Sequence, residues 1–115
     1  MKSKKLAEKL ADLMLQKKGT GILIMDLTKL TTITDYFVIC SASSDTQVKA
    51  ISDFIKDETK KLNERPWHNE GYTNLSWVLL DFVDVVAHIF LEETRRFYNL
   101  EGLWADAVIT EVRDK

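Results

Sequence analysis

The sequence of 115 residues contains few residues that interrupt or crosslink a chain, with one proline, four glycines and one cysteine. So little glycine and proline excludes a collagen-like or low-complexity protein. The single cysteine, Cys40, cannot form a disulfide within the chain, and its apolar neighbours predict a packed core residue and not a reactive thiol. Together with the composition, this cysteine usage predicts a protein of a reducing compartment, the cytoplasm.

The sequence also lacks an excess of charge of one sign and a long apolar run. Its formal net charge of -2 provides no broad basic field for a phosphate backbone, so we expect no DNA partner. A bilayer span needs roughly 20 apolar residues, and even the most apolar stretch, residues 77–90, contains Asp81, Asp84 and His88. We therefore expect no membrane association.

Length and hydrophobic pattern predict a single domain over residues 1–115, of the α/β class, in which helices pack on a mixed sheet. Helices are expected over residues 3–18 and from Ser44 onward, where Ser44 and Gln47 form a capping-box pattern. A short helical segment should include Arg95 and Tyr98, and residues 65–71 should form a loop. Strands are expected at residues 22–25, 36–41, 76–81, 84–91 and, at the end of the chain, 106–109.

The acidic residues within the apolar stretch do not predict a catalytic pair. In a continuous strand Asp81 and Asp84 would point to opposite faces of the sheet. If residues 82–83 instead form a tight turn, the aspartates flank it, in agreement with the turn preference of this residue type. His88 could share a strand face with Asp84 as an oriented general base, but no nucleophile is identifiable beside it.

Metal and cofactor sites are not predicted either. His68, His88 and Cys40 have separations that match none of the paired spacings of structural zinc sites. The Gly19-Thr20-Gly21 turn lacks the lysine and the length of a phosphate-binding loop. We therefore expect no cofactor.

An aromatic and charged segment near the end of the chain favours a protein interface. Within ten residues it contains Arg95, Arg96, Phe97, Tyr98, Leu100, Glu101, Leu103 and Trp104. Such residue types are enriched at interfaces. The same composition suits a short segment whose aromatic residues pack onto the sheet, and the residue types alone leave both interpretations open.

A series of short motifs extends over residues 5–107. They are Thr34-Asp35-Tyr36-Phe37-Val38-Ile39-Cys40, Gln47-Val48-Lys49-Ala50-Ile51, Glu70-Gly71, Trp77-Val78-Leu79-Leu80-Asp81, His88-Ile89-Phe90, Phe97-Tyr98-Asn99-Leu100-Glu101 and Leu103-Trp104-Ala105-Asp106-Ala107. In this order they resemble the ribosomal silencing factor (Iojap) family. The resemblance implies a nucleotidyltransferase-like fold without catalytic activity, so we expect no enzyme.

The resemblance also implies a partner and a mechanism. Members of the family bind the large ribosomal subunit through ribosomal protein L-fourteen, and they sterically block joining of the small subunit, which represses translation when nutrients are limited. Members also self-associate, so a homodimer is among the assemblies that the resemblance allows. Phe54 and Trp67 are the exposed apolar candidates for such a contact.

Transferred to this sequence, the resemblance gives a partner-facing or supporting set of seven residues: Trp77, Asp81, Asp84, Arg95, Tyr98, Glu101 and Trp104. Trp77 and Tyr98 are expected to be apolar anchors, and the acidic members to complement a basic ribosomal protein. His88 is expected to order the sheet.

The chain departs from the family at Val83, where the family usually places glycine before the second aspartate. A turn that requires positive φ would tolerate valine poorly. Either the backbone at Val83 is ordinary, or the local hairpin differs from that of the family and the position of Asp84 changes with it.

Two alternative functions belong to other classes. One is a nucleotidyltransferase-like enzyme that uses Asp26, Asp81 and Asp84. The other is an RNA-binding module that presents four lysines of the second helix: Lys49, Lys56, Lys60 and Lys61. At this net charge the lysines more simply form a solvated face.

Overall fold

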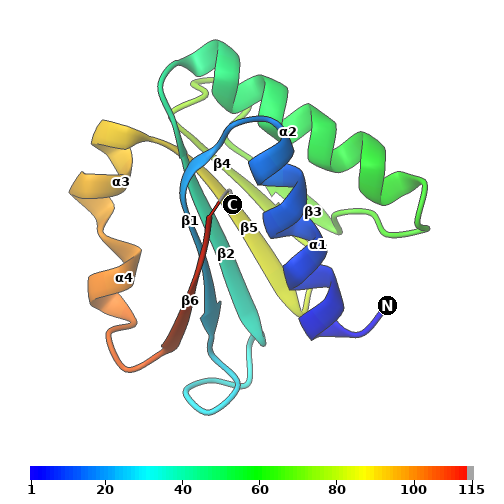
Figure 1. Ribbon diagram of the computed structural model, residues 1–115, viewed down its shortest axis with the longest axis vertical. Coiled ribbons are helices and arrows are strands. Elements are labelled where there is room, and N and C mark those ends of the chain that lie inside the picture. The colour runs from blue at the N-terminus through cyan, green and yellow to red at the C-terminus, as the bar shows by residue number, and fades with distance from the viewer. Residues whose placement is uncertain (114–115) are drawn as a thin grey trace.

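The computed structural model describes residues 1–113, in which helices cover both faces of a six-stranded sheet (Figure 1). The strands are β1 (Thr20–Asp26), β2 (Tyr36–Ala42), β3 (His68–Glu70), β4 (Trp77–Asp81), β5 (Val85–Leu91) and β6 (Val108–Val112). The helices are α1 (Ser3–Gln16), α2 (Asp45–Lys60), α3 (Glu92–Tyr98) and α4 (Leu100–Leu103). The strand order is β3-β4-β5-β2-β1-β6. Only β2 and β5 pair in parallel in this part of the chain, so the predicted mixed sheet is confirmed.

Two predicted elements need correction. Residues 65–71 are not all loop, because His68–Glu70 forms the edge strand β3 and pairs with β4. The sequence signal is weak here because the strand has three residues and all of them are exposed. The terminal strand begins at Val108 and extends to Val112, two residues later than predicted, where its pairing with β1 starts at Asp26.

Of the two hydrogen bonds predicted for the capping box of α2, one is confirmed and the other has a different partner. The Ser44 side-chain oxygen accepts a hydrogen bond from the Gln47 backbone N–H at 3.1 Å, as predicted. The Gln47 side chain, however, accepts from the backbone N–H of Ser43 at 2.7 Å, one residue before the predicted partner. The first hydrogen bond satisfies a donor that the first turn of the helix leaves free, and the second fixes the chain just before the N-cap.

Helices α1 and α2 bury the first face of the sheet. The apolar stripe of α1, which includes Leu6, Leu10 and Met14, packs with Ile51 and Ile55 of α2 over the centre of the sheet. Cys40 is fully buried in this cluster, and burial raises the pKa of its thiol to about 12. The prediction that Cys40 is an unreactive core residue is therefore confirmed.

The second face is covered over only part of its area. Leu100 of α4 packs on Met25, Ile39 and Phe90, which closes a smaller cluster over β1, β2 and β5. In Figure 1, α3 and α4 lie on the opposite side of the sheet from α1 and α2. Alternate residues of β4, Trp77, Leu79 and Asp81, face this second side and remain partly exposed. The fold thus separates a closed face from a partly open one.

The hairpin between β4 and β5 places a valine in an unfavourable conformation. Phe82 N–H donates to Val85 O at 2.8 Å, so Val83 and Asp84 form a two-residue loop. Val83 has a φ of 77°, and Asp84 N–H donates to Phe82 O at 3.1 Å, which closes a γ-turn around Val83. Turns of this kind with positive φ are rare and strained. The tight turn of one interpretation is therefore confirmed, but its loop is Val83–Asp84 and not residues 82–83, so Asp84 lies within the turn and does not flank it. The backbone at Val83 is not ordinary.

We predict that Val83→Gly stabilises the protein. The backbone strain of a non-glycine residue at positive φ costs about 1–3 kcal/mol, and glycine removes it. The greater flexibility of glycine in the unfolded chain costs about 0.5–1 kcal/mol. The free energy of unfolding, measured by urea denaturation, should rise by about 1 kcal/mol. Val83→Ala is the control, and it should gain less because it retains a Cβ atom. A decrease for the glycine variant would show that Val83 is not strained.

Candidate functional site

Aromatic side chains form a continuous row on the second face of the sheet. Trp77 lies at its centre, with its ring centroid 4.8 Å from those of both Phe90 and Tyr98. His88 continues the row toward Phe37, whose ring centroid is 4.5 Å away. We call this row the aromatic ridge, with the members Phe37, Trp77, His88, Phe90, Phe97, Tyr98 and Trp104. The fold thus brings together three of the predicted residues, Trp77, Tyr98 and Trp104.

His88 fixes the orientation of Trp77. The Trp77 indole N–H donates to His88 Nδ1 at 3.1 Å, and the two residues come from adjacent strands. An indole nitrogen can only donate, so His88 Nδ1 must be unprotonated and the proton of the neutral ring is on Nε2. His88 is 3% exposed, and burial lowers its pKa to about 3. This neutral imidazole orders the sheet, as expected, and its environment does not suit a general base near neutral pH.

One end of the aromatic ridge is exposed to solvent. Phe97 is 80% exposed and Tyr98 is 48% exposed, and Leu103 of the adjacent α4 is 73% exposed. Trp77 is half-buried between Tyr98 and the sheet. Contiguous exposed apolar groups of this kind mark interaction surfaces, and tryptophan and tyrosine are frequent interface anchors.

Asp81 and Asp84 lie at the other end of the ridge, at the β4–β5 turn. One Asp81 carboxylate oxygen accepts from Val83 N–H at 2.7 Å, so this side chain supports the turn. Asp84 is exposed, and its carbonyl oxygen accepts from Asp35 N–H at 2.8 Å and Tyr36 N–H at 3.1 Å. Three acidic residues, Asp35, Asp81 and Asp84, are therefore neighbours at this turn.

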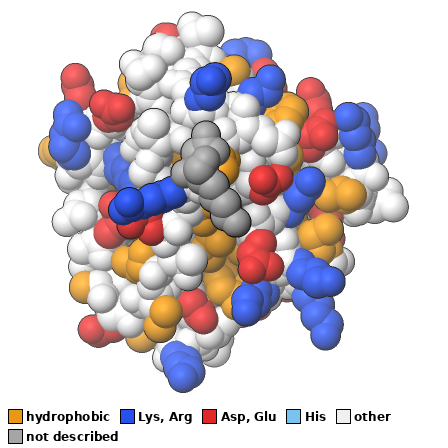
Figure 2. Space-filling model, viewed as in Figure 1, with side chains coloured by type: hydrophobic (Ala, Val, Ile, Leu, Met, Phe, Trp, Pro, Cys, Tyr) orange, Lys and Arg blue, Asp and Glu red, His pale blue; other side chains and the backbone are white. Residues whose placement is uncertain are grey.

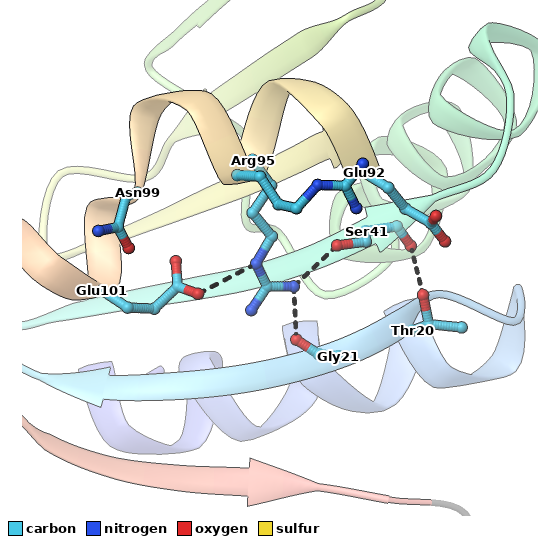
Figure 3. Close-up of a pocket in the computed structure, with 8 residues that line it drawn as sticks. Thr20, Gly21, Ser41, Glu92, Arg95, Asn99 and Glu101 are labelled. Carbon is cyan, nitrogen blue, oxygen red and sulfur yellow. Dashed lines mark hydrogen bonds and ion pairs between the residues drawn. The ribbon is translucent and has the colours of Figure 1, made fainter.

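Arg95 and Glu101 have a different environment from the ridge (Figure 3). Arg95 Nε donates to Glu101 Oε2 at 3.3 Å, while its Nη1 donates to Gly21 O at 2.7 Å and to Ser41 Oγ at 2.9 Å. The Arg95 side chain is only 12% exposed. We call these contacts the Arg95 bracket. It fixes α3 and α4 on β1 and β2, and α3 carries Tyr98, so the two charged residues support the ridge from within.

The three aspartates of the alternative enzymatic hypothesis do not converge. Asp26 lies in a cavity beside Lys4 and Glu8 of α1, on the first side of the sheet, whereas Asp81 faces the second. The Asp26 carboxylate accepts two hydrogen bonds from Thr28, which lower its pKa. Among residues 1–113, no group of three or more His, Cys, Asp and Glu side chains could hold a metal ion. The hypothesis of a site built from Asp26, Asp81 and Asp84 is therefore wrong.

The lysines in α2 and at its C-terminal end are partly neutralised by their neighbours. Lys49 pairs with Asp53 and Lys61 pairs with Glu58, each at 2.7 Å. Lys56 lies over the Tyr72 ring at 4.6 Å. Basic and acidic side chains are interspersed on the face that Figure 2 shows. These pairings weaken the case for an RNA-binding module, which needs unpaired cations along one track.

The two apolar residues expected to be exposed differ in their environment. Trp67 is 79% exposed, as expected, whereas Phe54 is half-buried and lies under the Lys17 ammonium at 4.6 Å. Within residues 1–113, no helix has both the length and the apolar character that a bilayer span requires.

Sequence reasoning missed a cavity of about 240 Å³ beside the ridge. Its lining includes Ile33 and Thr34 from the β1–β2 loop and Leu79 from β4. The period-two pattern of β4, which places residues 77, 79 and 81 on one side, could have indicated Leu79. The contribution of the loop could not be found in this way, because it depends on the hydrogen bonds that link residues 35–36 to Asp84.

Comparisons with known proteins agree on one family. A family model described as "Ribosomal silencing factor during starvation" matches residues 1–115. The ribosomal silencing factor of Bacillus subtilis is 40% identical over 96 residues, which cover 84% of this chain and 81% of that protein. The chloroplastic protein Iojap of Zea mays is 39% identical over 95 residues, which cover 83% of this chain and 41% of that protein.

Solved structures show the same fold. A crystal structure of a protein from Chromobacterium violaceum has a TM-score of 0.88 at 28% identity, and covers 91% of this chain and 88% of that one. A second, from Bacillus halodurans, has a TM-score of 0.77 at 32% identity, and covers 94% of this chain and 95% of that one.

We predict that His88 makes stability depend on pH. The pKa of His88 in the folded protein is about 3, below the ordinary value of 6.5. Below pH 6.5 the unfolded chain therefore binds the proton more readily, and the stability decreases as the pH is lowered. Between about pH 7.5 and pH 4.5 this effect should cost roughly 2–3 kcal/mol. Urea denaturation at both pH values should show that loss in the wild type and not in His88→Gln, which keeps an acceptor for Trp77. Equal pH dependence of the two proteins would contradict the assignment.

A second prediction concerns the Arg95 bracket. Arg95→Met keeps the aliphatic stem but removes the donors to Glu101, Gly21 and Ser41, so it should lower the free energy of unfolding by about 1.5–3 kcal/mol. Glu101→Gln, which retains an acceptor, should lose less than about 1 kcal/mol. Hydrogen exchange should show faster opening of residues 92–103 in Arg95→Met. Unchanged exchange there would show that the bracket does not hold α3 and α4.

Proposed function

Because the chain belongs to the ribosomal silencing factor family, whose members regulate translation on the ribosome, we propose that it binds the large ribosomal subunit through ribosomal protein L-fourteen. Bound there, it sterically blocks joining of the small subunit and so represses translation when nutrients are limited. No chemical step on the ribosome is part of the proposal.

The observation that supports this function best is the exposed end of the aromatic ridge. Trp77 and Tyr98 are in contact, and the hydrogen bond to His88 together with the Arg95 bracket holds both in place before any partner arrives. Anchors that are already ordered lose little conformational entropy on binding. This face therefore suits a protein partner whose own surface contains a complementary apolar depression.

Charge at the turn end of the ridge supports a basic partner. Asp35, Asp81 and Asp84 lie together there, and Asp84 is exposed. Ribosomal proteins that contact RNA are commonly basic, and complementary charge fixes orientation and speeds association. The two ends of the ridge would then have different roles, with apolar contact around Trp77 and Tyr98 and orientation by the carboxylates.

Size is sufficient for a steric mechanism. The molecule measures 35 × 33 × 31 Å, so a copy bound at an intersubunit surface would keep two large particles apart over that distance. Such a mechanism requires affinity and correct placement, and it requires no nucleophile or metal ion.

We predict that removing the anchors abolishes anti-association activity. Truncation of a central aromatic anchor commonly costs 2 kcal/mol or more, so Trp77→Ala with Tyr98→Ala should weaken binding to the large subunit by about 100-fold or more. Sucrose-gradient sedimentation with magnesium measures both subunit joining and cosedimentation.

The matched control is Trp67→Ala, which removes an exposed tryptophan outside the ridge and should leave both activities intact. Circular dichroism must show that each variant is folded, and Tyr98→Ala alone serves as the milder test because Tyr98 is on the rim. Wild-type protein that neither binds the large subunit nor prevents joining would overturn the proposed function. Normal activity of the folded double variant would overturn only the assignment of the anchors.

A further inference from the structure

The cavity beside the ridge has apolar walls and opens on the proposed binding face. Its apolar lining is formed by Ile33, Phe37, Leu79, Val83, Val86 and Trp104, and its polar lining by Thr31, Thr34, Asp81 and His88. At the rim, Ile33 is 83% exposed and Val83 is 54% exposed. Phe37 and Trp104 also belong to the aromatic ridge, so the cavity and the ridge form one surface.

Two buried polar groups that line this cavity lack hydrogen-bond partners. Thr34 is 7% exposed and His88 is 3% exposed, and both line the cavity. Neither Thr34 Oγ1 nor His88 Nε2 has a partner among residues 1–113. Buried polar groups are nearly always paired, because leaving one unpaired costs its desolvation without compensation. Two such groups in the lining of one cavity indicate that an occupant completes the site.

The polar groups restrict the chemistry of that occupant. His88 Nδ1 accepts from Trp77, so its Nε2 carries a proton and requires an acceptor. The Thr34 hydroxyl can donate or accept. No lysine or arginine lines the cavity, and the Asp81 carboxylate does, so an anion is not favoured. A lysine or arginine side chain could pair with Asp81, but it would bring donors only and would leave the His88 proton unpaired.

A carboxamide meets these requirements, because it offers a carbonyl acceptor and an N–H donor on an uncharged group that apolar walls can surround. We propose, on the basis of the function proposed above, that the cavity receives one asparagine or glutamine side chain of the ribosomal protein partner. Its carbonyl oxygen accepts from His88 Nε2–H, and its amide group bonds to the Thr34 hydroxyl. The continuity of the cavity with the ridge favours a side chain of the same partner over a free small molecule.

The first test fills the cavity. Leu79→Trp places an indole in the cavity from β4, and it should weaken binding to purified ribosomal protein L-fourteen by at least about tenfold, the loss of one well-packed contact. Val108→Trp is the matched control, because Val108 is an exposed strand residue on the first side of the sheet, and binding should be unchanged. Wild-type binding by Leu79→Trp would overturn the cavity proposal and leave the proposed function standing. Failure of the wild type itself to bind would overturn both.

The second test does not depend on repacking. Thr34→Val removes an unpaired hydroxyl from the free protein, so it should raise the Tm, yet it should weaken binding by about threefold to tenfold because the partner's amide loses its bond. A raised Tm with unchanged affinity would overturn the role of Thr34 in the site.

A direct observation is available from the imidazole protons. The chain has two histidines, and His68 is exposed, so it serves as an internal reference. In the nitrogen–proton spectrum of labelled protein, the His88 Nε2–H signal should move downfield when ribosomal protein L-fourteen binds, because the proton gains an acceptor. A signal that stays in place in the bound state would overturn the proposal.

Discussion

The hydrogen bond from the Trp77 indole to His88 determines most of what the second face of the sheet can do. It joins β4 to β5 through side chains, so it orients the tryptophan at the centre of the face. It also sets the tautomer of His88, because an indole can only donate and the remaining proton must be on Nε2. One contact thus fixes an anchor of the proposed interface and produces the unpaired donor in the neighbouring cavity.

The two faces of the sheet differ in how completely helices cover them. The face under α1 and α2 is closed by aliphatic side chains and contributes mainly to stability. The other face receives only the short α3 and α4, which the Arg95 bracket attaches to β1 and β2. Because few groups are shared between the faces, substitutions on the open face should change binding with little effect on the core.

Much of the fold could be predicted from the sequence, because long apolar periodicities identify most of its helices and strands. The stripe of α1, the apolar runs of β2 and β5, and the Ser44 cap all identify their elements without tertiary information. The strand β3 could not be predicted, since its three exposed residues are held only by pairing with β4. The departure from the family at Val83 is visible in the sequence, but the positive φ of Val83 follows from the closure of the hairpin and not from its residue type. For the site, the expectation that Trp77 and Tyr98 are anchors comes from the family resemblance, because residue types alone leave packing and interface roles open. The internal contacts of Arg95 and the cavity at Thr34 arise from segments distant in sequence.

The order of the strands has a consequence for synthesis of the chain. The central parallel pair joins β2 to β5, with Tyr36 opposite Val85, so the middle of the sheet forms from segments far apart in sequence. Such non-local pairing forms late in folding. Trp104 follows β5 and joins the ridge through Phe37 of β2, so the ridge is complete only after that pair has closed. A nascent chain therefore cannot present the complete ridge until residues 98–104 have left the exit tunnel, so the face proposed for ribosome binding is unavailable earlier in synthesis.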